Sequence, residues 1–128
     1  MTTAFRLSVV IPVSERYDDV EALYHAYKVA LESLKRSCEF IYVLDGEFPA
    51  VFAILDRLRR GGEPIKIVTL AKWFGEATAL TIGFAHATGE IILTLPAYRQ
   101  VEPQDIPQLV RSLDGYHMGT SKNPAARF

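Results

Sequence analysis

The sequence contains one cysteine, Cys38, in 128 residues, which excludes a disulfide framework and a metal site built from thiolates. It also lacks any stretch near the roughly 18 to 20 consecutive apolar residues that span a bilayer. The amino terminus has neither the basic start nor the apolar core of a secretory signal. We therefore expect a cytoplasmic protein, with any attachment to the inner face of the membrane supplied by carboxyl-terminal regions or by partners.

The chain also lacks an excess of one charge sign, since its 14 basic and 15 acidic residues nearly cancel. Long contacts with nucleic acid need a basic field, so we expect no DNA or RNA partner. The length suits one domain, which on average has on the order of 100 to 150 residues. We expect that domain over residues 1–120 and an aperiodic tail over 121–128, where a longer natural chain would have been cut. The oligomeric state is left open.

Two common nucleotide-binding signatures are absent. No glycine-rich phosphate turn follows the first apolar run, and no Walker-type lysine motif occurs, which argues against a Rossmann dehydrogenase and a P-loop NTPase. A flavodoxin-like or receiver-like domain is a weaker alternative. A receiver needs an aspartate after its third strand, and Leu70-Ala71-Lys72 does not supply one.

What the sequence does contain is an alternation of strand and helix patterns. Unbroken apolar runs, typical of strands covered on both faces, occur at Leu7–Val13 and Phe40–Leu44. Pro12 is expected to mark the end of the first run. Further strands are predicted at Ile65–Leu70, Ile91–Leu95 and Tyr116–Gly119, and helices at Asp18–Lys35, around Val51–Leu58, from Gly75 to Ala87 and at Ile106–Leu113. This order predicts an α/β fold with an open, mostly parallel sheet and helices on both faces.

In such a sheet, ligands bind where the strands end and the connecting loops gather. The segments at these ends include VVIPVSER, VLDGE and LAKWFGEATALTIGFAHATGEIILTL. In this order and spacing they resemble the family 2 glycosyltransferases, most closely the polyprenyl-phosphate (dolichyl-phosphate) sugar synthases, over roughly residues 6–121. The family's counterparts are Pro-Val-Tyr-Asn-Glu, Val-Asp-Asp-Gly-Ser and Leu-Ser-Arg-Asn-Phe-Gly.

The resemblance implies a Rossmann-like nucleotide-diphospho-sugar transferase fold, called glycosyltransferase A. It also implies a UDP- or GDP-linked sugar as the donor. The sugar would pass with inversion to a lipid-phosphate or glycan acceptor, in polysaccharide or glycolipid biosynthesis. By the same resemblance, the expected donor-binding residues are Pro12, Val13, Ser14, Glu15, Asp45, Gly46, Lys72, Gly75, Pro96, Tyr98 and Arg99.

Asp45 falls where the family's aspartate faces the nucleotide base, and a carboxylate accepts hydrogen bonds from a base N–H. The alternative is that Asp45 only caps the following turn or helix. Lys72 replaces an arginine and keeps a cation for the diphosphate, without the bidentate fork. His86, in the last turn of a helix, is interpreted as a dipole partner or packed surface residue.

The departure from the family follows the fourth predicted strand. The family carries Asp-x-Asp there to hold Mg²⁺ or Mn²⁺, and this chain has Pro96-Ala97-Tyr98, which offers no such ligand. Either the enzyme works without the usual metal, or it recruits other groups, or it no longer transfers sugar. The groups considered for recruitment are Glu47, Glu102, Lys72 and Arg99.

No general base can be named, because the family places it beyond the last residue of this chain. Trp73, which replaces an asparagine, departs from the family pattern too. The second hypothesis is therefore a degenerate, non-catalytic relative that binds a nucleotide or a partner protein.

Overall fold

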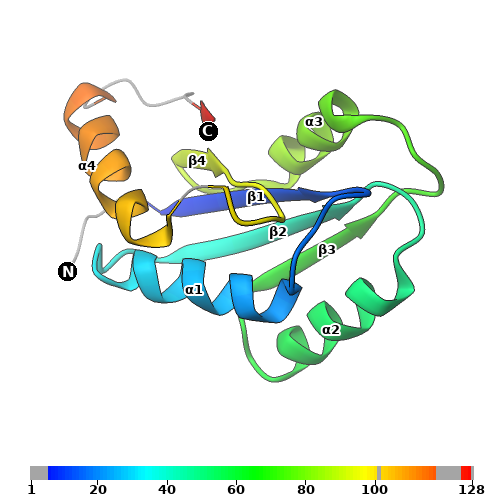
Figure 1. Cartoon of the computed structure of the whole chain (residues 1–128). Helices are drawn as coiled ribbons and strands as arrows, with labels where there is room; N and C mark the ends of the chain where they lie inside the picture. Colours follow the sequence, from blue (N-terminus) through cyan, green and yellow to red (C-terminus); the bar gives the residue numbers. More distant parts are fainter. Residues whose placement is uncertain (1–5, 101, 118–124, 128) are drawn as a thin grey trace.

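The computed structural model describes residues 6–100, 102–117 and 125–127. Its centre is a five-stranded parallel sheet in the order β3-β2-β1-β4-β5 (Figure 1). The strands are β1 (Leu7–Val13), β2 (Cys38–Leu44), β3 (Ile65–Thr69), β4 (Ile91–Thr94) and β5 (Ala125–Arg127). The helices are α1 (Val20–Glu32), α2 (Pro49–Arg60), α3 (Glu76–His86) and α4 (Ile106–His117), the last preceded by the 3₁₀ turn η1 (Pro103–Asp105).

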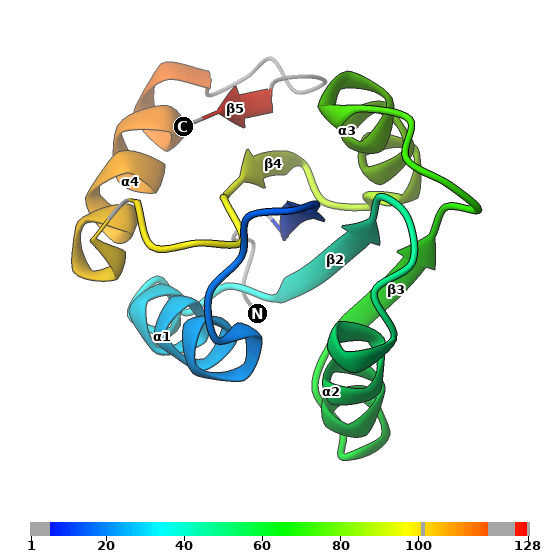
Figure 2. The same cartoon turned by 45° about the vertical axis from the view of Figure 1, so that its right-hand side comes forward.

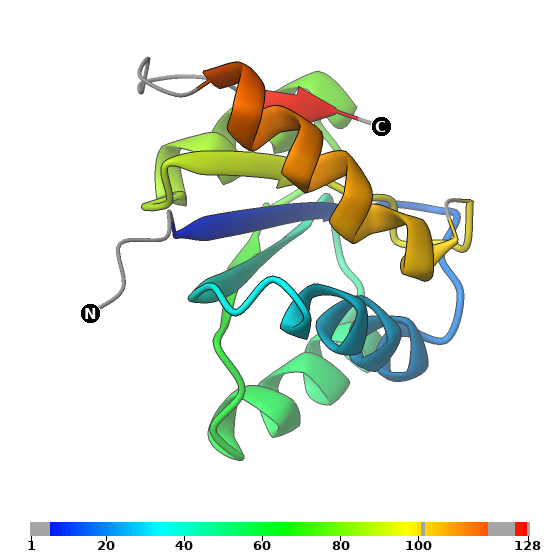
Figure 3. The same ribbon diagram turned by 90° about the vertical axis from the view of Figure 1, so that its left-hand side faces the viewer.

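The sheet is covered on both faces, as the apolar runs predict. Alternate residues of β1 enter two different cores: Val9 and Ile11 pack with α1, α2 and α4, and Val10 packs with α3. Figure 2 shows α3 alone on its side of the sheet, and Figure 3 shows α1 and α4 beside each other on the opposite side. The predicted α/β architecture is therefore confirmed.

The strand order reverses at β1, since the chain adds β2 and β3 on one side of β1 and β4 on the other. Such a reversal leaves a crevice at the carboxyl ends of the two strands that flank it. The β1–β4 pairing ends at Val10, whose carbonyl accepts from the N–H of Leu95 at 3.1 Å. Pro12 lies inside β1, and not at its end as predicted. It is tolerated because it lies past the last residue paired with β4.

Helix α1 begins at a carboxylate cap and buries one stripe. The side chain of Asp19 accepts from the N–H of Ala22 at 3.0 Å. The buried side chains recur at helical spacing and are Val20, Leu23, Tyr24, Tyr27 and Leu31. The helix is shorter than the predicted Asp18–Lys35 because Asp19 stands outside it as the cap and because Lys35 has a φ of 54°.

Two predictions near the carboxyl terminus are wrong. Helix α4 runs to His117, through the first half of the strand predicted at Tyr116–Gly119, and the second half lies outside the described residues. One internal glycine, Gly115, costs a helix only about 1 kcal/mol, too little to end it. Strand β5 lies instead in the segment predicted to be an aperiodic tail, because three residues are too few to show a period.

Helix α3 approaches the sheet closely at Gly83. A Cβ added there would lie 2.4 Å from Cγ1 of Val10 and 3.3 Å from Cγ2 of Val43. We expect Gly83→Val to lower the free energy of unfolding by about 1 to 3 kcal/mol through overpacking. Urea unfolding measures it, with Ala77→Val, at an exposed position of α3, as the control for placing a valine in this helix. Equal losses in the two variants would contradict the close packing.

Among the described residues, no helix has the length and apolar character that a membrane crossing needs.

Candidate nucleotide-sugar site

Two adjoining pockets open at the carboxyl edge of the sheet, and Asp45 belongs to both. The more enclosed one, here called the inner pocket, has a volume of about 180 Å³ and is lined by Pro12, Ser14, Arg16, Asp45, Glu76, Pro96, Ala97 and Tyr98. The outer pocket has a volume of about 410 Å³ and is lined by Glu15, Asp45, Gly46, Glu47, Phe48, Ala71, Lys72 and Trp73.

Asp45 is the central side chain of the site and is only 2% exposed. Its own N–H donates to the carbonyl of Val13 at 2.9 Å, which fixes it beside the end of β1. Its two carboxylate oxygens accept from the N–H groups of Phe74 at 2.7 Å and Gly75 at 3.0 Å. Asp45 therefore ties the loop before α3 to the end of β2. A carboxylate offers about four lone-pair sites, so acceptor capacity remains for a ligand.

Two glycines give the backbone its path around Asp45. Gly46 has a φ of 125°, and Gly75, the N-cap residue of α3, has a φ of 105°. Side chains of L-residues disfavour these angles, so the turn after β2 and the start of α3 both need glycine. The resulting turns carry Glu47 and Trp73 at the outer pocket.

The segment after β4 is held against the start of α1. The Tyr27 hydroxyl donates to the carbonyl of Pro96 at 2.8 Å. The N–H of Asp18 donates to the carbonyl of Ala97 at 3.0 Å, and the N–H of Arg99 donates to the Asp18 carboxylate at 2.6 Å. Burial raises the pKa of Tyr27 to about 12, so its hydroxyl keeps its proton at neutral pH. These bonds fix Pro96 and its neighbours as one wall of the inner pocket.

A cation lies on that wall. The guanidinium carbon of Arg16 is 3.9 Å from the centroid of the Tyr98 ring, within range of a cation–π interaction. Arg16 carries no local pattern in the sequence that marks it as a site residue, because its contact joins the end of β1 to the end of β4. The only available signal was that Arg16 lies just past the first strand, in the segment VVIPVSER.

Most of the predicted donor-binding residues meet at these pockets. Val13 does not face them, because its side chain is fully buried in the core. Arg99 is exposed and lines neither pocket, and Gly75 contributes its N–H to Asp45. Of the groups considered for recruitment in place of the usual metal site, Glu47 and Lys72 line the outer pocket, and Glu102 lines neither. His86 lies at the end of α3, where its Nδ1 is 3.0 Å from the carbonyl of Ile82.

The residues of the site do not fit a divalent metal ion. Pro96, Ala97 and Tyr98 occupy the wall where carboxylate ligands would be needed, and none of these three side chains is a ligand that Mg²⁺ or Mn²⁺ prefers. Within the described ranges, no group of three or more histidine, cysteine, aspartate or glutamate side chains is placed to hold a metal.

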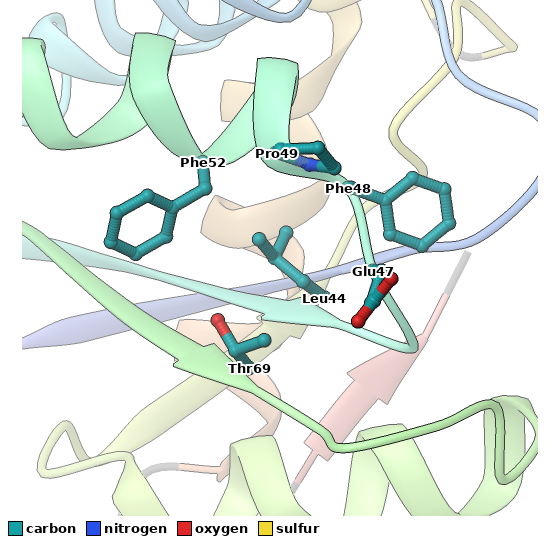
Figure 4. Close-up of a pocket in the computed structure, with 6 residues that line it drawn as sticks. All are labelled: Leu44, Glu47, Phe48, Pro49, Phe52 and Thr69. Carbon is teal, nitrogen blue, oxygen red and sulfur yellow. The ribbon is translucent and has the colours of Figure 1, made fainter.

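A third pocket, of about 480 Å³, lies beyond the outer one, between the start of α2 and the ends of β2 and β3 (Figure 4). It is mostly apolar, and its only charged lining group is Glu47. The residues around it are Leu44, Glu47, Phe48, Pro49, Phe52 and Thr69.

With this geometry in place, the comparisons with known proteins assign the family. The sequence profile described as "Glycosyl transferase family 2" matches residues 8–120. The chain belongs to glycosyltransferase family 2. The match includes every segment that lines the inner and outer pockets.

Curated members of family 2 resemble the chain over most of its length. The undecaprenyl-phosphate 4-deoxy-4-formamido-L-arabinose transferase of Enterobacter sp. (strain 638) is 35% identical over 113 residues, covering 87% of this chain and 35% of the relative. The enzyme of the same name from Edwardsiella ictaluri (strain 93-146) is 34% identical over 112 residues, covering 86% of this chain and 34% of the relative. The chain thus spans about a third of the length of these relatives.

A solved structure with the same fold is the mannosyltransferase PcManGT from Pyrobaculum calidifontis, in complex with GDP-Man and Mn²⁺. The TM-score is 0.59 at 19% identity, and the match covers 88% of this chain and 33% of that one. This likeness confirms the predicted glycosyltransferase A fold.

Proposed function

We propose that this family 2 domain binds a nucleoside-diphosphate sugar, linked to UDP or GDP, in the joined inner and outer pockets. The observation that carries the proposal is the meeting of Ser14, Asp45 and Tyr98 at one edge of the sheet, from three different strand ends. Together the two pockets reach the volume of small-molecule sites, roughly 300 to 1,000 Å³.

The chemistry of the outer pocket suits a nucleobase. Trp73 is 68% exposed and offers an aromatic face on which a base can stack. Glu15 and Glu47 offer carboxylates that accept from base N–H groups. Asp45 lines both pockets, so the ribose would lie beside it, between the base in the outer pocket and the diphosphate in the inner pocket.

The acceptor is proposed to be a lipid phosphate. The relatives are named undecaprenyl-phosphate sugar transferases, which supports this choice over a glycan. Because the chain spans about a third of their length, the acceptor site and the general base would belong to further chain or to a partner. A place at the cytoplasmic face of the membrane is part of the proposal.

A second candidate function is a non-catalytic relative that binds a nucleotide or a partner protein. Pro96 and Tyr98, at the positions of the family's metal ligands, favour it. The two candidates differ in turnover: a transferase supplied with its acceptor site moves the sugar to the lipid phosphate and releases UDP or GDP, and the non-catalytic relative binds the conjugate unchanged.

Calorimetric titration with UDP, GDP and their sugar conjugates tests the proposal. We expect a Kd in the micromolar to millimolar range, roughly 4 to 8 kcal/mol of binding free energy. Trp73→Ala should weaken binding about tenfold through lost stacking. Phe52→Ala, in the third pocket, should leave the Kd unchanged. The absence of heat with every nucleotide, or equal effects of the two variants, would contradict the proposed site.

A further inference from the structure

We propose that Arg16, held over the ring of Tyr98, binds the diphosphate of the donor in the inner pocket without a divalent metal ion. This inference rests on the proposed function and names the group that replaces the metal. The solved mannosyltransferase of the same fold is described with Mn²⁺, whereas the corresponding wall of this pocket lacks carboxylate ligands. The site therefore needs another source of positive charge for the diphosphate.

Arg16 is placed to supply this positive charge. Its guanidinium carbon lies 3.9 Å from the ring centroid of Tyr98, and both side chains line the inner pocket. Tyr98 stands where the resemblance places the second metal-binding aspartate. The substitution thus exchanges a carboxylate that would hold a cation for an aromatic ring that holds a cation from the protein itself.

The guanidinium of Arg16 is also uncommitted. Its side chain makes no hydrogen bond or ion pair with any residue in the part of the chain that the structure describes. By contrast, Arg57 pairs with Glu21 at 2.5 Å and Arg60 pairs with Asp56 at 2.9 Å. Arg16 therefore keeps five N–H donors, in the fork that matches phosphate oxygens.

The remaining charges of the inner pocket suit a ligand with both an anionic and a hydroxylic part. Asp45 and Glu76 are its two carboxylates. The negative charge of Asp45 is partly offset by the N–H groups of Phe74 and Gly75. These carboxylates can accept from ribose or sugar hydroxyls while Arg16 meets the diphosphate. A nucleoside diphosphate sugar supplies both kinds of group.

The platform under Arg16 is rigid. Pro96 and Ala97, next to Tyr98, are hydrogen-bonded to Tyr27 and Asp18 of the α1 segment, and the N–H of Arg99 is bonded to Asp18 on the other side of Tyr98. The aromatic ring is therefore set before any ligand arrives. Pre-organisation of this kind lowers the entropic cost of binding.

The test is a titration with GDP and UDP in EDTA, repeated with MnCl₂, followed by guanosine and uridine as ligands without phosphate. We expect equal Kd values, within about twofold, with EDTA and with Mn²⁺. Arg16→Ala should weaken the diphosphates at least about tenfold and the nucleosides by no more than about twofold. Arg111→Ala, on an exposed arginine of α4 outside both pockets, is the matched control and should leave every Kd unchanged.

Two further variants separate charge from packing. Tyr98→Phe keeps the ring and should preserve the diphosphate Kd, and Tyr98→Leu removes it and should weaken binding about threefold to fivefold.

The double variant Pro96→Asp with Tyr98→Asp introduces two carboxylates at the positions where the family carries its metal ligands. Its diphosphate binding should become dependent on Mn²⁺.

The outcomes distinguish this inference from the proposed function. Nucleotide binding that EDTA abolishes and Mn²⁺ restores in the unmodified chain overturns the inference and leaves the proposed function standing. Binding that is unchanged in Arg16→Ala does the same. The absence of nucleotide binding under both conditions overturns both.

Discussion

Replacing Glu39 with alanine is expected to lower the free energy of unfolding by about 2 to 3 kcal/mol, because it leaves the buried hydroxyl of Ser8 and several more exposed donors without their acceptor. Glu39 is 3% exposed and lies at the end of the sheet opposite the pockets. It accepts from Ser8 Oγ at 2.6 Å and from the N–H of Thr88 at 2.7 Å, and it pairs with Lys66 at 3.1 Å and Arg6 at 3.4 Å. Urea unfolding measures the loss, and Glu32→Ala, on an exposed glutamate, is the control.

The same carboxylate gives the fold a pH dependence of known sign. Burial alone would raise the pKa of Glu39, but the hydrogen bonds from Ser8, Thr88 and Lys66 lower it to about 2. Its ordinary value is about 4.3, so the ionised form contributes about 3 kcal/mol that is fully present above that pH. This contribution is lost as the pH falls through about 2. Unfolding of Glu39→Gln should lack this step, and an identical acid profile in both chains would contradict the assignment.

Asp45→Ala is expected to have two effects of different origin. Removing its hydrogen bonds to Phe74 and Gly75 should destabilise the fold by about 2 to 3 kcal/mol. Removing the carboxylate shared by both pockets should weaken UDP or GDP binding more than about tenfold. Urea unfolding and calorimetry measure the two effects separately.

The conservative variant Asp45→Asn keeps one acceptor oxygen and should lose about half as much stability. Glu90→Ala, on an exposed carboxylate just before β4 and away from both pockets, is the control and should change neither quantity. Lost stability with unchanged nucleotide affinity in Asp45→Ala would mean that Asp45 only caps the loop before α3, which is the alternative that the sequence leaves open.

The strands and helices were largely predictable because both faces of the sheet are buried. A strand such as β1 is then apolar at nearly every position, and that pattern is visible without any partner. The helices that cover the sheet show their buried stripe in the same direct way, as α1 does. The short edge strand β5 carries no such pattern, which is why it was missed.

The candidate site was predictable as a place but not as a set of contacts. Strand ends and family motifs pointed to Ser14, Asp45 and Tyr98, and these residues meet at the inner pocket because parallel strands bring their carboxyl ends together. The engagement of Asp45 with Phe74, and the stacking of Arg16 on Tyr98, join residues far apart in the chain. Whether such contacts form depends on the direction in which each side chain points. The spacing of apolar residues along the sequence does not encode that direction.

The amino end of the sheet was missed for the same reason. Glu39 lies in an apolar run, and nothing in the sequence around it indicates its contacts with Ser8, Thr88, Arg6 and Lys66. Gly89 belongs to the same arrangement, since a Cβ there would lie 2.6 Å from the carbonyl oxygen of Arg6. The glycine before β4 is therefore explained by close packing of two backbones, and not by the site.

The most direct test of the central claim, that a nucleotide binds at the carboxyl edge of the sheet, is to map amide chemical shifts during titration with UDP and GDP. The account predicts changes at Ser14, Asp45, Trp73 and Tyr98, with Glu39 and Thr88 at the opposite end unaffected. Changes centred on Glu39 and Thr88, or none at saturating nucleotide, would contradict it.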